Sequence, residues 1–91
     1  MQFQTITKPI APDCFNSIRM PARANLLTTV TRSNSIYAVF LVDDNDSTEY
    51  INFDIITIVD GEEFNHDGDV KFLGSHVVNG YMYSVFHLIY N

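Results

Sequence analysis

Carboxylates are the most frequent ionisable side chains in this 91-residue sequence. Ten of the eleven acidic residues lie between positions 43 and 69, and no lysine or arginine lies among them. Carboxylates in this number could hold a divalent cation, transfer protons in catalysis, or attract a basic partner. The candidate residues are Asp43, Asp44, Asp46, Glu49, Asp54, Asp60, Glu62, Glu63, Asp67 and Asp69.

The start of this acidic stretch has the alternating oxygen ligands of a calcium-binding loop. Asp44, Asp46 and Thr48 stand two residues apart, as they would at the start of an EF-hand loop. However, Glu49 occupies the position that requires glycine, and Ile55 occupies the position of the bidentate glutamate. The EF-hand interpretation therefore fails.

Zinc binding or nucleophilic catalysis would require cysteine and histidine residues in a suitable arrangement. The chain has one cysteine, Cys14, and its three histidines, His66, His76 and His87, are widely spaced. A lone cysteine between apolar neighbours is typically an inert core residue. Residues 65–69 could offer oxygen ligands to a divalent cation, but Asp/Gly loops of this composition are usually ordinary turns. The sequence contains no phosphate-binding loop or catalytic motif. We therefore expect a protein that is not an enzyme and that has no cofactor or metal.

Charge is distributed unevenly along the chain. The formal net charge is −6, yet residues 1–32 contain four basic residues and only one acidic residue. An acidic protein lacks the positive surface needed to bind nucleic acid or an anionic membrane directly. The expected partner is therefore a basic protein. The alternative is that the carboxylates only keep a small apolar domain soluble.

The sequence patterns around these carboxylates predict mainly strands. Residues 3–8 alternate, and residues 36–42 are continuously apolar, which predicts a central strand. The polar run 43–47 predicts a turn that joins this strand to residues 48–59 in an antiparallel hairpin. Asn79-Gly80, between two apolar runs, predicts a final hairpin of residues 70–78 and 81–90.

Two segments near the N-terminus are harder to interpret. Pro12 and Pro21 bracket a segment with apolar residues at helical spacing, which predicts a short helix over Asp13–Met20. Residues 22–34 fit a helix by spacing, but their β-branched run favours a strand.

The predicted fold is mainly β, bordering on α+β. It has one antiparallel sheet of five or six strands, open or curled towards a barrel, with the short helix packed on it. A length of 91 residues, 46% of them hydrophobic, predicts one domain, residues 1–91. A single cysteine, no signal peptide and no long apolar run indicate a reducing cytoplasm. The predicted core consists of Ile36, Val39, Leu41, Phe53, Ile55, Val85 and Phe86.

The expected function is that of a small binding protein. Residues i and i+2 of a strand lie about 6.6 Å apart, a spacing comparable to that of successive phosphates. We therefore expect the two acidic loops and the Asp54 face to form one electronegative surface for a basic, nucleic-acid-binding protein. In composition, residues 43–69 resemble those of small acidic phage proteins that inhibit host DNA-binding or restriction proteins by mimicking DNA. That resemblance implies an antirestriction role.

The aromatic residues support an alternative function. The chain contains seven phenylalanines and five tyrosines, and the last strand is apolar on both faces. One small sheet cannot cover so many large apolar side chains, so the sequence predicts a homodimer. Under this alternative, the protein assembles through its C-terminal strand, and the acidic loops serve only solubility.

Overall fold

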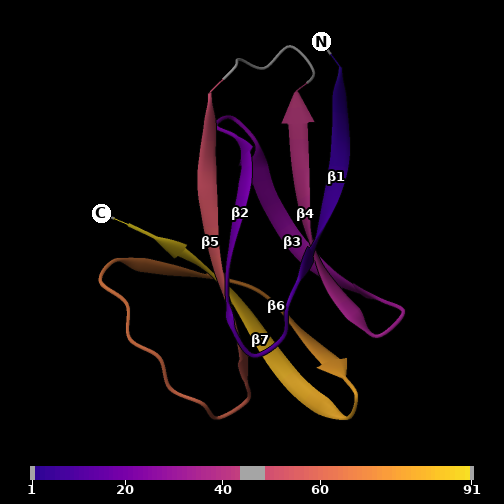
Figure 1. The fold of residues 1–91 in the computed structure, drawn as a ribbon, viewed down its shortest axis with the longest axis vertical. Coiled ribbons are helices and arrows are strands. Elements are labelled where there is room, and N and C mark those ends of the chain that lie inside the picture. Colours follow the sequence, from indigo (N-terminus) through magenta and orange to yellow (C-terminus); the bar gives the residue numbers. More distant parts are fainter. Residues whose placement is uncertain (1, 44–48, 91) are drawn as a thin grey trace.

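Within the described residues, the fold consists of seven antiparallel strands in two sheets (Figure 1). The structure, a computed structural model, describes residues 2–43 and 49–90. One sheet has three strands in the order β1-β4-β3, and the other has four in the order β2-β5-β7-β6. Neither sheet closes into a barrel. The strands are β1 (Phe3–Ile10), β2 (Phe15–Pro21), β3 (Asn25–Arg32), β4 (Ser35–Asp43), β5 (Tyr50–Val59), β6 (Asp69–Val78) and β7 (Tyr81–Ile89).

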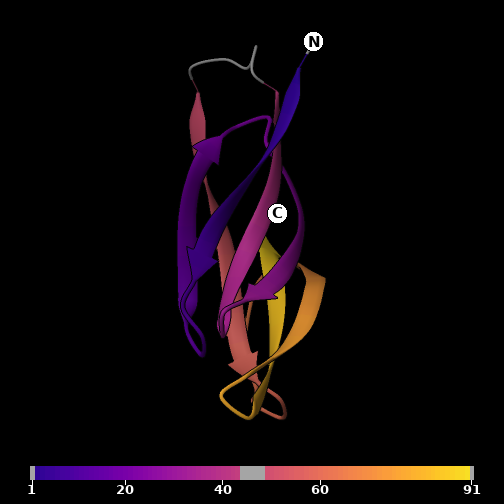
Figure 2. The same ribbon diagram turned by 90° about the vertical axis from the view of Figure 1, so that its right-hand side faces the viewer.

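The molecule is elongated and thin, with extents of 41 × 33 × 15 Å, as its profile in Figure 2 shows. Strand β5 runs along most of the long axis. It begins at the end where the N-terminus lies, and residues 60–68 start at the opposite end and return to the middle of the molecule, where β6 begins (Figure 1). This strand therefore separates the two groups of acidic residues that flank it in the sequence.

The core lies between the two sheets. Along β4 the even-numbered residues Ile36, Ala38, Phe40 and Val42 are buried. The ring of Phe40 meets the ring of Phe53 edge to face, with the centroids 5.2 Å apart, and thereby joins the two sheets.

The predicted core is confirmed in part. Ile36, Phe53, Ile55 and Val85 are buried, whereas Val39, Leu41 and Phe86 are only half-buried. Val39 and Leu41 lie on the other face of β4, because successive side chains of a strand alternate between faces. A segment that is apolar at every position does not indicate which of its faces is buried.

The predicted helix over Asp13–Met20 is wrong, since the described residues contain no helix and residues 15–21 form β2, paired with β5. The turn before β2 uses a positive φ of 55° at Asp13, and Asn16 Nδ2 donates to the Ala11 carbonyl at 3.1 Å. Pro9 and Pro21 lie in β1 and β2, which are edge strands. Proline is tolerated in an edge strand because its missing N–H breaks no ladder hydrogen bond. The prolines therefore mark sheet edges rather than helix ends.

The predicted hairpin between residues 36–42 and 48–59 is also wrong. Strand β4 pairs with β1 and β3, whereas β5 pairs with β2 and β7, so the chain crosses between sheets after Asp43. Both edges of β4 are occupied, one of them by β3 through a tight turn at Ser33 and Asn34. The other predicted hairpin is confirmed, with φ of 51° at Asn79 and 82° at Gly80.

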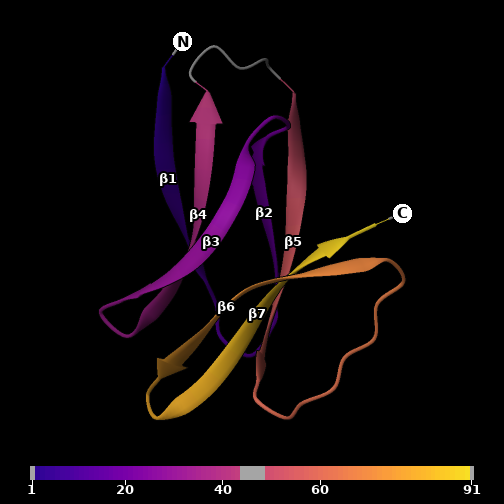
Figure 3. The same ribbon diagram turned by 180° about the vertical axis from the view of Figure 1, so that it is seen from behind.

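A polar seam joins the edge strands β3 and β6, which lie next to each other when seen from behind (Figure 3). His76 Nε2 lies 2.6 Å from Thr29 Oγ1, and His76 Nδ1 lies 2.7 Å from Thr31 Oγ1. Thr28 Oγ1 donates to the Leu73 carbonyl at 3.2 Å. This seam connects the two sheets along one side without a backbone ladder.

Two buried threonines differ in their hydrogen bonding, and this predicts opposite effects on stability. Thr57 is fully buried and its Oγ1 has no partner among the described residues, whereas Thr29 Oγ1 bonds His76. We expect Thr57→Val to raise the free energy of unfolding by about 1 kcal/mol, because it removes an unsatisfied hydroxyl. Thr29→Val should lower it by about 1–3 kcal/mol, since His76 loses a partner. Urea denaturation of both variants would contradict this account if the two shifts had the same sign.

Candidate functional site

The outer face of the four-stranded sheet presents a row of apolar side chains, here named the apolar row. Phe15 on β2 lies opposite Ile56 on β5. Ile56 lies opposite Phe86 on β7, and Phe86 lies opposite Phe72 on β6. Directly opposite residues of antiparallel strands share a face, so these four side chains cross the whole sheet on one side. Their face is the outer one, because the neighbouring β5 residues Phe53, Ile55 and Thr57 point into the core.

The acidic segment, residues 60–69, is held against this face. The Phe64 ring lies 5.4 Å from the Phe86 ring, and His66 Nε2 donates to the Ile89 carbonyl at 3.0 Å. Gly68 has a φ of 141°, and a Cβ there would collide with the carbonyl oxygen of Ile89. These contacts hold the middle and the end of the segment in place.

The start of the acidic segment is tied to the sheet as well. The Asp60 amide donates to the Met82 carbonyl at 2.9 Å, and the Glu62 amide donates to the Val59 carbonyl at 3.0 Å. The Val59 amide in turn donates to Glu62 Oε1 at 2.7 Å. The segment is therefore an ordered part of the surface, although its sequence is that of a polar loop.

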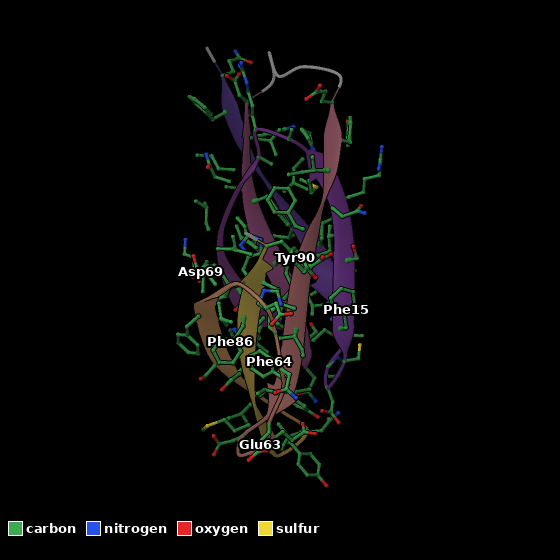
Figure 4. All side chains as sticks on the ribbon, turned by 90° about the vertical axis from the view of Figure 1, so that its left-hand side faces the viewer. Phe15, Glu63, Phe64, Asp69, Phe86 and Tyr90 are labelled. Carbon is green, nitrogen blue, oxygen red and sulfur yellow. The ribbon has the colours of Figure 1, made fainter. Side chains whose placement is uncertain are left out.

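The carboxylates of this segment surround the aromatic side chains. Figure 4 shows Glu63 and Asp69 on different sides of Phe64 and Phe86. The five carboxylates that the segment contributes are exposed, and within the described residues none of them forms an ion pair. They are Asp60, Glu62, Glu63, Asp67 and Asp69. An apolar centre with a charged rim is the usual anatomy of a protein-binding surface.

Asp54 belongs to the same face but is already engaged. Ser17 Oγ donates to Asp54 Oδ1 at 2.8 Å, and the Tyr90 hydroxyl also hydrogen-bonds Asp54. The hydrogen bond to this carboxylate raises the pKa of Tyr90 above its ordinary value, and desolvation adds to the shift. The edge of the Tyr90 ring system meets the His66 ring, with the centroids 4.9 Å apart. The cluster links the C-terminal end of the chain to the acidic segment.

The remaining candidate carboxylates lie elsewhere. Asp43 ends β4 and Glu49 precedes β5, so both lie at the far end of β5, about 30 Å from Asp60, where the acidic segment begins, at 3.3 Å per residue. Each has an interaction partner within the protein. Asp44 and Asp46 lie outside the described residues. The structure thus places Asp54 on the outer face and holds the acidic segment against that face through Phe64, whereas Asp43 and Glu49 lie at the other end of β5.

Sequence reasoning missed three members of this face: Phe15, Ser17 and Tyr90. Phe15 and Ser17 were assigned to a helix, so their alignment with Ile56 and Asp54 on β5 was not visible. Tyr90 follows the last strand, and only the pairing of β5 with β7 brings it near Asp54. The alternation of polar Ser17 and Arg19 with apolar Ile18 and Met20 was the available signal for a strand.

The cysteine and the histidines do not form a catalytic constellation. Cys14 is exposed rather than in the core, with Sγ 3.6 Å from the Ala11 carbonyl oxygen. His66 bonds the Ile89 carbonyl, and His76 lies in the seam, where burial lowers its pKa. Burial also lowers the pKa of His87, and Lys71 lowers it further, while Asp54 acts in the opposite direction. The three rings therefore serve separate structural contacts.

Two further types of site are not found in the part of the chain that is described. Within residues 2–43 and 49–90, no group of three or more histidine, cysteine or acidic residues could hold a metal ion. The same residues include no helix that is long and apolar enough to cross a membrane.

The comparisons with known proteins give no match. No family model matches the chain, and no curated protein or solved structure is significantly similar to it.

Proposed function

We propose that this chain is a non-enzymatic binding protein that captures a basic, nucleic-acid-binding protein of the cytoplasm. In this proposal its carboxylates occupy the partner's phosphate-binding groups and so inhibit the partner. The observation that supports it is the acidic segment, in which five exposed carboxylates lie within ten residues of an ordered loop and, among the described residues, form no ion pair.

The order of this loop favours binding over a role in solubility alone. A charged loop that only keeps a protein dispersed has no need of a defined conformation. Residues 60–68, by contrast, are held through Phe64, His66 and Gly68. Charges presented in one conformation lose less entropy on binding than charges on a mobile loop.

Displacement by DNA would test this proposal. The immobilised protein is incubated with a cell lysate, and bound proteins are challenged with duplex DNA at constant ionic strength. We expect nucleic-acid-binding proteins to be captured and then released by the DNA, because both ligands compete for the same basic groups. Capture that is unchanged by DNA would contradict the proposal, and a matched wash with uncharged polymer controls for dilution.

Assembly through the C-terminal strand stays a prediction, but the strand pairing limits the ways in which two copies could meet. Strand β7 lies between β5 and β6 in the four-stranded sheet, so both of its edges already form backbone ladders. A second copy could not extend the sheet through β7. It could only pack on the outer face, where the carboxylates of the acidic segment would meet their own copies.

A further inference from the structure

We propose that the outer face of the four-stranded sheet binds an arginine-rich segment of the partner protein, with guanidinium groups stacked on Phe15 and Phe72 and paired with the surrounding carboxylates. This inference rests on the proposed function and specifies its partner. Three features support this inference: two exposed phenylalanine rings, the apolar row between them, and the negative charge of Asp54 and the acidic segment, here named the rim.

The first feature is the exposure of the two rings at the ends of the apolar row. Phe15 is 54% exposed on edge strand β2, and Phe72 is 56% exposed on edge strand β6. Three steps between neighbouring strands, each about 4.8 Å, place the ends of the row about 14 Å apart. Phe72 also lies 5.6 Å from Phe86, which in turn contacts Phe64, so the rings form a connected platform. Exposed apolar surface of this kind marks interaction sites.

The second feature is the rim, which selects the charge of the occupant. Glu63 and Asp69 lie on different sides of Phe64 and Phe86, and Ser17 beside Phe15 bonds Asp54. Single-stranded nucleic acid also stacks on aromatic platforms, but it needs a positively charged groove. An anionic membrane is repelled for the same reason. A cationic polypeptide is complementary to both the rings and the rim.

The rim also argues against a second copy of this chain as the occupant. Two copies related by a twofold axis would bring the same surface patch of each into contact. The carboxylates of residues 60–69 would then face one another across a partly desolvated interface. Like charges placed opposite each other in an interface are unfavourable.

The third feature is the chemistry of the rings, which favours arginine over lysine. A guanidinium is planar, stacks on aromatic faces and pairs with a carboxylate through two parallel hydrogen bonds, whereas an ammonium is a hydrated point charge. The chain uses this contact internally. Arg19 lies over the Tyr50 ring at 5.8 Å, and Arg32 lies over the Tyr37 ring at 5.9 Å.

The test compares two peptides of equal charge, one with six arginines spaced by alanine and one with six lysines in the same positions. Affinities for the full chain are measured by calorimetry at physiological ionic strength. We expect the arginine peptide to bind about five- to thirtyfold more tightly. In the double variant Phe15→Leu, Phe72→Leu, which keeps apolar area but removes the π faces, the two affinities should become nearly equal. Phe3→Leu, at a ring that is exposed outside this face, should keep the preference.

The outcomes separate this inference from the proposed function. If both peptides bind the wild-type chain equally, or if the double variant keeps the preference for arginine, the inference is overturned and the proposed function stands. If neither peptide binds, both are overturned. Sedimentation of the chain alone gives a further check: a concentration-dependent dimer that the double variant abolishes would make this face a self-interface and overturn the inference. Circular dichroism and thermal melts establish that each variant is folded.

Discussion

Replacing Phe40 with alanine should lower the free energy of unfolding by about 3–5 kcal/mol. The side chain is fully buried in the middle of β4 and its ring meets Phe53 of the other sheet, so the truncation leaves a cavity between the two layers. A domain of this size has a total stability of about 5–15 kcal/mol. The variant should therefore melt at least about 12 °C lower than the wild-type chain.

The matched control for this prediction is Phe3→Ala. Phe3 is 55% exposed at the start of edge strand β1, so its removal creates no cavity. Its effect on the free energy of unfolding should stay near 0.5 kcal/mol. Equal losses of stability in the two variants, measured by urea denaturation, would contradict the placement of the core between the sheets.

The mainly β character of the fold could be predicted from the sequence because the turn at Asn79-Gly80 and the apolar run of residues 36–42 are strong local signals. Asn79 and Gly80 both take positive φ, which asparagine and glycine tolerate, and the apolar runs on either side of them pair as expected. The central position of residues 36–42 followed from their continuous apolar character. Phe53 and Ile55 of β5 were predicted for the core, and both are buried.

The division into two sheets could not be predicted, because strand pairing depends on contacts between segments that are distant in sequence. Residues 43–47 have turn composition, but that composition is shared by links that close a hairpin and by links that cross between sheets. Likewise, Pro12 and Pro21 suit the ends of a helix and the neighbourhood of an edge strand equally well. Residues 15–21 form a strand because β2 pairs with β5, and residues 12–21 alone do not indicate that pairing.

The candidate site was predicted in its charge but not in its arrangement. Glu63 and Asp69 stood out by composition, and the structure places them on different sides of Phe64 and Phe86, whose rings are in contact on the outer face. The apolar row was not predicted, because it depends on the registers of three strand pairs. A shift of one residue in any of these registers would move a ring to the core face.

The second large effect should come from neutralising the rim. The double variant Glu63→Gln, Asp67→Asn removes two exposed charges that make no interaction within the described residues. We expect the association rate with the captured partner to fall by about tenfold at low salt, because electrostatic attraction speeds the encounter. The free energy of unfolding should change by less than about 0.5 kcal/mol per substitution.

The control variant removes the same charge from the other end of β5. Asp43→Asn with Glu49→Gln gives the chain an equal net charge, but its changes lie at the other end of β5, about 30 Å from Asp60, where the acidic segment begins, at 3.3 Å per residue. If the outer face binds the partner, this variant should associate almost as fast as the wild-type chain. The comparison therefore separates the position of the charges from their sum.

The association rate of the captured partner, measured by stopped flow across a range of salt concentrations for the wild-type chain and both variants, tests the binding face most directly. The wild-type rate should fall steeply as salt shortens the Debye length to about 8 Å at physiological strength. Glu63→Gln, Asp67→Asn should give a slower rate at low salt and a shallower salt dependence, while the control variant follows the wild-type chain. If the rate and the salt dependence of Glu63→Gln, Asp67→Asn equal those of the wild-type chain, the outer face is not the binding surface, and the carboxylates of residues 60–69 serve only solubility.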